Sequence, residues 1–185
     1  MDYEISNDSI WLVGANIVLS PNCDARPLNP DIDLLIVHGI SLPPKEYGGG
    51  YIDKLFTNTL NPDEHPYFMK IKELRVSSHL LIDRQGKVTQ YVPFDMRAWH
   101  AGESSFDGRD NCNDYSIGIE LEGCDDEEYC DDQYVVLAKI TELICQRWQK
   151  IKKGRIVAHS DVAPDRKTDP GPLFDMNYYF SLLKI

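Results

Sequence analysis

Residues 34–39 read LLIVHG, and this stretch decides the fold. The run from Leu34 to Val37 is apolar on both faces, which is typical of a buried central strand rather than of a surface strand. His38 and Gly39 follow at the point where we expect the strand to end. The pattern therefore places the imidazole of His38 at the rim of a sheet, where loops commonly shape binding clefts.

Other segments supply neighbours for this strand. SSHLLID (77–83) and KVTQYV (87–92) are separated by turn formers, so they predict a hairpin. SIGIELEG (116–123) alternates, with isoleucines and leucine on one face and a polar second face that carries Glu120 and Glu122. We expect all three segments to be strands.

The clearest helix begins after an acidic run. Apolar residues recur at three-four spacing up to Trp148, and Asp131 or Asp132 can cap the start. A strand is expected at 155–158, and residues 174–185 are expected to form a short packed helix. The segments 41–52 and 97–116 have the composition of loops.

These elements predict an α/β (α+β) fold with a central mixed β-sheet flanked by helices. The chain has 185 residues, of which 42% are hydrophobic, and this is enough to bury one core. We find no linker or internal repeat, so we expect a single domain over residues 1–185.

Charge and cysteine usage restrict the partners and the compartment. A formal net charge of −11 would repel phosphate backbones and anionic lipids, so we expect no nucleic-acid and no membrane partner. No obligate protein partner is evident. The five cysteines form no C-x-x-C pair, and acidic residues precede the short apolar stretch 10–19 where a secretory signal carries positive charge. We therefore expect a cytoplasmic protein.

Three metal-ligand types stand at separate points of the chain. His38 ends one predicted strand, His159 ends another, and Asp169 lies on the proline-rich segment that follows. Two imidazoles and a carboxylate with a fourth position left for water are the donors of a catalytic zinc site. An ordinary alternative stays open at this point: strand-ending histidines are more often hydrogen-bonded than metal-bound, and Asp169 before Pro170 suits a turn.

The motifs as a set resemble a known family. They are LLIVHGISLPP (34–44), LRVSSHLLIDRQG (74–86), RAWHAGES (97–104), NDYSIGIELEG (113–123) and IVAHSDVAPDRKTDPGPLFD (156–175). In this order they resemble the zinc-dependent N-acetylmuramoyl-L-alanine amidases, the fold shared with peptidoglycan recognition proteins. The likeness runs from near Trp11 to near Phe174 and is nearest to the cytoplasmic branch that acts on 1,6-anhydromuropeptides in cell-wall recycling.

The resemblance implies a ligand set and two catalytic roles. His38, His159 and Asp169 would bind one Zn²⁺ per chain, Glu120 would act as acid and base, and Lys167 would stabilise the transition state. The chemistry agrees, since zinc lowers the pKa of bound water to about 7 and a nearby carboxylate can move its proton. Without the motif, Glu120 would pass for a solvated strand carboxylate and Lys167 for a surface lysine.

The resemblance also implies substrate contacts at Tyr67, Arg75, Trp99 and His100. An indole face suits apolar sugar surface, an imidazole can hydrogen-bond sugar, and Arg75 can pair with a stem-peptide carboxylate. Packing is the equal alternative for Trp99.

Two positions depart from the family pattern. Close relatives have an asparagine after the first zinc histidine and an arginine before the CND of the fourth motif, whereas this chain has Gly39 and Asn111. The ligand set and Glu120 are unaffected. Any effect is therefore expected in contacts with the muramyl group or the peptide.

We thus expect a zinc amidase that hydrolyses the bond between (1,6-anhydro)-N-acetylmuramic acid and L-alanine of the stem peptide. One alternative is a peptidoglycan-binding module without activity, whose ligand binding would survive metal removal. Another is a lytic amidase, which would prefer intact sacculi to soluble fragments.

Overall fold

Six strands form the largest sheet in the part of the chain that the computed structural model describes, which is residues 2–8, 10–27 and 31–185. Met1, Ser9 and residues 28–30, which the prediction of one domain over 1–185 includes, lie outside the described residues. The strands run in the order β12-β5-β11-β6-β7-β3. Neighbours from β12 to β6 are parallel, β7 is antiparallel to β6, and β3 is parallel to β7. The predicted mixed sheet is therefore present.

The six strands of this sheet are β3 (Asn16–Ile17), β5 (Leu34–Ile40), β6 (Leu80–Ile82), β7 (Val88–Gln90), β11 (Ser116–Glu122) and β12 (Ile156–Ala158). The smaller two-stranded pairs are β1 (Glu4–Ile5) with β2 (Leu12–Val13), β4 (Cys23–Ala25) with β8 (Met96–Ala98), and β9 (Ser105–Phe106) with β10 (Arg109–Asp110). The helices are α1 (Tyr51–Phe56), α2 (Pro66–Ile71), α3 (Asp131–Arg147), α4 (His159–Val162) and α5 (Met176–Leu182), with 3-10 turns at Cys112–Asp114 and Lys153–Arg155.

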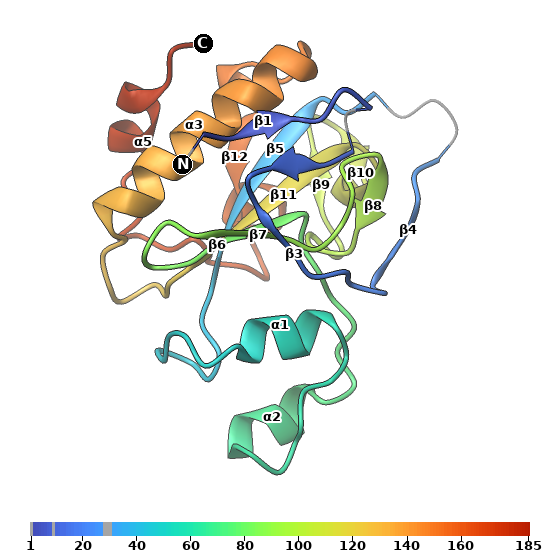
Figure 1. Ribbon diagram of the computed structural model, residues 1–185, viewed down its shortest axis with the longest axis vertical. Helices are drawn as coiled ribbons and strands as arrows, with labels where there is room; N and C mark the ends of the chain where they lie inside the picture. Colours follow the sequence, from blue (N-terminus) through green and yellow to red (C-terminus); the bar gives the residue numbers. More distant parts are fainter. Residues whose placement is uncertain (1, 9, 28–30) are drawn as a thin grey trace.

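One face of the sheet is covered by α3 and α5, which lie next to each other in Figure 1. Odd-numbered residues of the central strands, such as Val37 and Ile119, pack there against Leu137 and Ile144 of α3. At the opposite end of the molecule, α1 and α2 pack over a second apolar cluster that contains Phe56 and Phe68. The functional residues are therefore to be sought on the even-numbered face, which α3 leaves uncovered.

Helix α3 begins one residue earlier than its predicted caps allow. Cys130 is the N-cap, its N–H donates to Oε1 of Gln133 at 3.1 Å, and Asp131 and Asp132 lie in the first turn. Gln133 is fully buried and its Nε2 also donates to the carbonyl of Glu122 at 3.0 Å. The prediction of an aspartate cap was therefore wrong, because a buried glutamine ties the helix start to the sheet.

Several boundaries and elements differ from the predictions. Strand β5 continues to Ile40, two residues past His38, because β11 pairs with it in parallel up to Glu122. The segments 41–52 and 97–116 are not wholly loop, since α1 begins in the first and short strands and a 3-10 turn occupy the second. Within the described ranges, no helix is long enough and apolar enough to cross a bilayer.

Candidate metal centre and active site

Parallel pairing brings the predicted ligands together. In register, Glu120 of β11 is the partner of His38 of β5, and Ala158 of β12 is the partner of Val37. His159 follows Ala158 as the first residue of α4, so both imidazoles come from neighbouring strand ends on one face. The loop after α4 folds back on that helix, and the carbonyl of Asp169 accepts from the N–H of Ser160 at 3.1 Å. The sheet register brings His38 and His159 together, and this loop brings Asp169 to them.

The three predicted ligands converge on one point. Nδ1 of His38 and Nδ1 of His159 are 2.9 Å apart, and Oδ2 of Asp169 is 2.9 Å from the second and 3.4 Å from the first. All three ligand atoms lie within 4.8 Å of one another. The edges of a tetrahedron with bonds of 2.0–2.1 Å to zinc are about 3.3 Å long. The spacing therefore fits a small tetrahedral cation.

The outer nitrogens of both histidines already have partners. Nε2 of His159 faces the carbonyl of Ala101 at 3.2 Å and must donate to it, so the lone pair of Nδ1 points to the centre. Nε2 of His38 is 2.9 Å from Nδ1 of His100, whose Nε2 is 3.2 Å from Oγ of Ser116. Outer partners of this kind orient metal-binding imidazoles and fix their tautomers. The donor set thus fits a metal ion.

The charge states suit metal binding. Burial lowers the pKa of His38 to about 4, so its imidazole is neutral at neutral pH, as a ligand must be. Burial alone would raise the pKa of Asp169, but hydrogen bonds with His159 and His38 outweigh it and hold that pKa well below its usual range. The neutral imidazole of His38 and the carboxylate of Asp169 therefore face the centre.

Glu120 lies beside these ligands and is buried. Its Oε1 is 4.0 Å from Nδ1 of His38, and its side chain is about 10% exposed. Among the described residues, none hydrogen-bonds its Oε2. Burial, and then the carboxylate of Asp169, raise the pKa of Glu120 well above its usual value, while Lys167 opposes this. A carboxyl group that is unpartnered and desolvated next to a metal site is poised to exchange protons.

The neighbouring strand carboxylate shows the contrast. Glu122 is also buried, but its two oxygens accept from the backbone N–H groups of Gly48 at 2.6 Å and of Arg84 at 3.3 Å. It fastens two loops to β11. The polar face of this strand, which sequence alone would assign to solvent, is buried throughout.

A cleft of about 450 Å³ opens over the ligands, and its lining includes Gly39, Glu120, His159, Lys167 and Asp169. The four residues predicted to bind substrate, Tyr67, Arg75, Trp99 and His100, line the same cleft.

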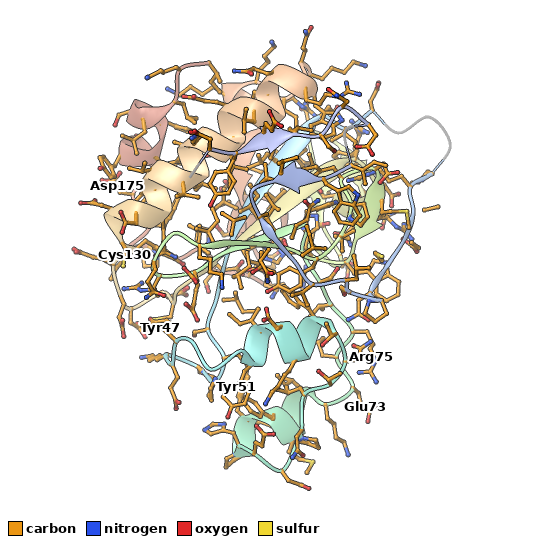
Figure 2. The ribbon with its side chains drawn as sticks, in the orientation of Figure 1. Tyr47, Tyr51, Glu73, Arg75, Cys130 and Asp175 are labelled. Atoms are coloured by element: carbon orange, nitrogen blue, oxygen red, sulfur yellow. The ribbon has the colours of Figure 1, made fainter. Side chains whose placement is uncertain are left out.

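Arg75 is exposed on the segment that leads out of α2 (Figure 2). Trp99 is half-buried and its Nε1 donates to Asp24 at 3.2 Å. The ring nitrogens of His100 are both occupied inside the protein. Substrate contact by these residues stays a prediction.

The departures at Gly39 and Asn111 have different surroundings. A Cβ at Gly39 would lie 2.3 Å from the hydroxyl of Tyr129, which donates to the carbonyl of Pro170 at 2.8 Å. The space that a side chain would need there is therefore filled. Asn111 is exposed in a left-handed conformation (φ 57°) and does not belong to the lining of the catalytic cleft.

Sequence reasoning missed the residues that hold the ligands from outside. The Arg166 guanidinium donates to the carbonyls of Ala101 at 2.6 Å and of Glu103 at 2.7 Å. A Cβ at Gly118 would lie 2.5 Å from the ring of His100, so this glycine admits the imidazole that supports His38. A glycine inside a strand often marks such a close approach, and this was the available signal.

Comparison with known proteins gives the family. The model of the N-acetylmuramoyl-L-alanine amidase family matches residues 28–172. The chain belongs to this family. The 1,6-anhydro-N-acetylmuramyl-L-alanine amidase AmpD of Escherichia coli strain K12 is 56% identical over 165 residues, which are 89% of this chain and 90% of that relative. The predicted family is confirmed, together with the predicted likeness to 1,6-anhydro-N-acetylmuramyl-L-alanine amidases.

Solved structures of amidases have the same fold. The crystal structure of a selenomethionine derivative of AmpD superposes with a TM-score of 0.91 at 53% identity and covers 94% of this chain and 96% of the other. The amidase AmiD of E. coli has been solved in complex with anhydro-N-acetylmuramic acid-L-Ala-D-γ-Glu-L-Lys. It superposes with a TM-score of 0.61 at 29% identity, and the match covers 86% of this chain and 60% of the AmiD chain. The predicted fold class is confirmed.

Proposed function

We propose that this amidase-family chain is a zinc enzyme that hydrolyses the amide between the lactyl group of 1,6-anhydro-N-acetylmuramic acid and L-alanine in murein recycling. The observation that carries the proposal is the convergence of His38, His159 and Asp169 beside the buried, unpartnered Glu120 on the floor of a cleft. The relatives support the substrate class, because AmpD is named for this bond and AmiD is solved with such a muropeptide.

The metal and the protein divide the work. A zinc ion held by the two Nδ1 atoms and the carboxylate would lower the pKa of a water and polarise the scissile carbonyl. Glu120 accepts a proton from the attacking water and returns it to the departing amine of L-alanine. Its raised pKa makes the carboxylate a stronger base for the first step and lets the carboxyl group hold the proton until the amine departs.

Lys167 and the cleft walls complete the site. Lys167 is half-buried in the lining, and its ammonium group offsets negative charge that develops on the substrate carbonyl. Leu42, Phe56 and Leu74 form an apolar wall, while Tyr67, Trp99 and Arg75 offer aromatic and cationic surface to a sugar and an acidic peptide. These six side chains are the surface that we assign to muropeptide binding.

We assign the activity to residues 1–185 as one unit and place it in the cytoplasm. All five cysteines carry free thiols, as expected where thiols are kept reduced. The soluble product of wall turnover, rather than intact wall, is the substrate that such a location supplies. Activity on anhydromuropeptides that exceeds activity on whole sacculi would support this; the reverse preference would overturn it.

Zinc-loaded protein is incubated with an anhydromuropeptide, and the release of L-alanyl peptide is followed by mass spectrometry. We expect release by the parent, loss of both metal and release in Asp169→Ala, and loss of release with full metal content in Glu120→Gln. Glu122→Gln is the matched control on the same strand face and keeps turnover, because Glu122 contacts only structural amides. Absence of peptide release by the zinc-loaded parent would end the proposal.

A further inference from the structure

Two consecutive residues support both histidines of the metal centre from outside. The ring of His100 meets Nε2 of His38 at 2.9 Å, and the carbonyl of Ala101 accepts from Nε2 of His159 at 3.2 Å. His38 lies in β5 and His159 begins α4, and the two lie 121 positions apart in the chain. The orientation of both imidazoles therefore depends on the position of one dipeptide after β8.

One side-chain atom holds this dipeptide. Oδ1 of Asn113 accepts from the N–H of His100 at 3.1 Å and from the N–H of Ala101 at 2.8 Å. The backbone of Asn113 is itself fixed, because its carbonyl accepts from the buried guanidinium of Arg26 at 3.1 Å. The side-chain oxygen of Asn113 therefore fixes the positions of two adjacent peptide groups.

Ser77 and Arg166 also restrict the position of the His100–Ala101 dipeptide. Ser77 exchanges hydrogen bonds with the preceding Trp99, and Arg166 donates to the same Ala101 carbonyl that His159 uses. These contacts constrain the two ends of the segment, whereas Asn113 alone among the described residues accepts from both of its central amides.

From these contacts we propose that Asn113 is a positioning residue for the metal centre, acting through His100 and Ala101 on both histidine ligands. The inference rests on the proposed function, because it concerns how firmly zinc is held. Without the oxygen of Asn113, two amide donors lose their acceptor and the dipeptide moves toward water to satisfy them. When the dipeptide moves, His38 loses its contact with the ring of His100, and His159 loses its hydrogen bond to the carbonyl of Ala101.

The expected effect is on metal affinity. Loss of an outer partner of a metal ligand typically weakens binding by about 10- to 100-fold. Because Asn113 supports two ligands at once, we expect the upper part of that range. Asn113 also lines the cleft, so the rival role is a direct contact with substrate, which would raise KM and leave zinc affinity unchanged.

The test measures the zinc dissociation constant by competition with a chromophoric chelator, on purified variants of the 185-residue chain and without substrate. Asn113→Ala removes the acceptor and Asn113→Asp keeps it. We expect Asn113→Ala to bind zinc more weakly by about 100-fold and Asn113→Asp to retain the parental affinity. Asn111→Asp is the matched control two positions earlier, where the side chain makes no capping bond, and it retains parental affinity.

Parental zinc affinity in Asn113→Ala, or an equal loss in Asn113→Ala and Asn113→Asp, overturns the inference. If Asn113→Ala does not fold, the zinc off-rate of Asn113→Ser decides instead: its shorter side chain removes the amide oxygen that accepts from His100 and Ala101, so faster release supports the inference and an unchanged rate overturns it. Failure of the proposed function is a separate result, because the zinc-loaded parent would then release no L-alanyl peptide, whatever the zinc affinity of the Asn113 variants.

Discussion

Replacement of Gly39 by alanine tests how the strand end, the Tyr129 hydroxyl and the ligand loop are packed together. The added Cβ would lie 2.3 Å from the hydroxyl oxygen of Tyr129 and 3.2 Å from Cα of Pro170. The phenol ring has little room to move, since it fills the space where a Cβ at Gly123 would lie and packs edge-on against Phe174. The collision must therefore displace the hydroxyl from the Pro170 carbonyl.

The magnitude follows from two terms. Overpacking a filled core costs about 1–3 kcal/mol, and loss of a buried hydrogen bond adds about 0.5–1.5 kcal/mol, so Gly39→Ala should lower the free energy of unfolding by about 1.5–4.5 kcal/mol. Tyr129→Phe leaves the Pro170 carbonyl without its donor and should cost about 1–3 kcal/mol. In the Tyr129→Phe background the colliding oxygen is gone, so Gly39→Ala should cost at least about 1 kcal/mol less there.

The assay is urea unfolding of the four proteins of this double-mutant cycle at one fixed zinc concentration. A positive coupling would show that Gly39 is required by the hydroxyl of Tyr129 rather than by strand geometry. Equal costs of Gly39→Ala in both backgrounds, to within about 0.5 kcal/mol, would refute the steric reasoning.

Three further predictions concern the site and its support. Lys167→Met should keep zinc but lower kcat by about 10²-fold or more, as removal of one charge-stabilising group does; unchanged kcat would exclude the assigned role. Burial, with Arg26 adding, holds the pKa of His79 well below its usual value, so the unfolded chain binds a proton that the native chain does not and stability falls below about pH 6.5. His79→Gln should therefore reduce the slope of unfolding free energy against pH by about 1.4 kcal/mol per pH unit below about pH 6, and urea titrations with the parental slope would contradict this. Chelation should abolish peptide release and lower the melting temperature, both restored by zinc, since a ligand that binds only the native state stabilises it; muropeptide binding that outlasts chelation with no loss of turnover would contradict a metal role.

The strands that carry the site could be predicted because their signals are local. The apolar run at Leu34 to Val37 and the alternation at 116–122 reflect burial of strand faces, and the helix from 131 to 147 reflects three-four spacing. The donor types at His38, His159 and Asp169 are equally local, since a residue's chemistry does not depend on the fold. These local features left a metal site and hydrogen-bonded histidines as open alternatives, and the resemblance to the amidases favoured the metal site.

What the sequence by itself determined is which segments are strands or helices and which side chains can bind a metal. Only the tertiary structure decided that Glu120 stands opposite His38 in register, that the polar face of β11 is buried, and that His100, Ala101 and Asn113 support the ligands. The physical reason is that register, burial and hydrogen bonds between distant segments depend on two segments at once. The pattern along one segment indicates which of its faces is apolar, whereas the contacts that form this site join residues far apart in the chain.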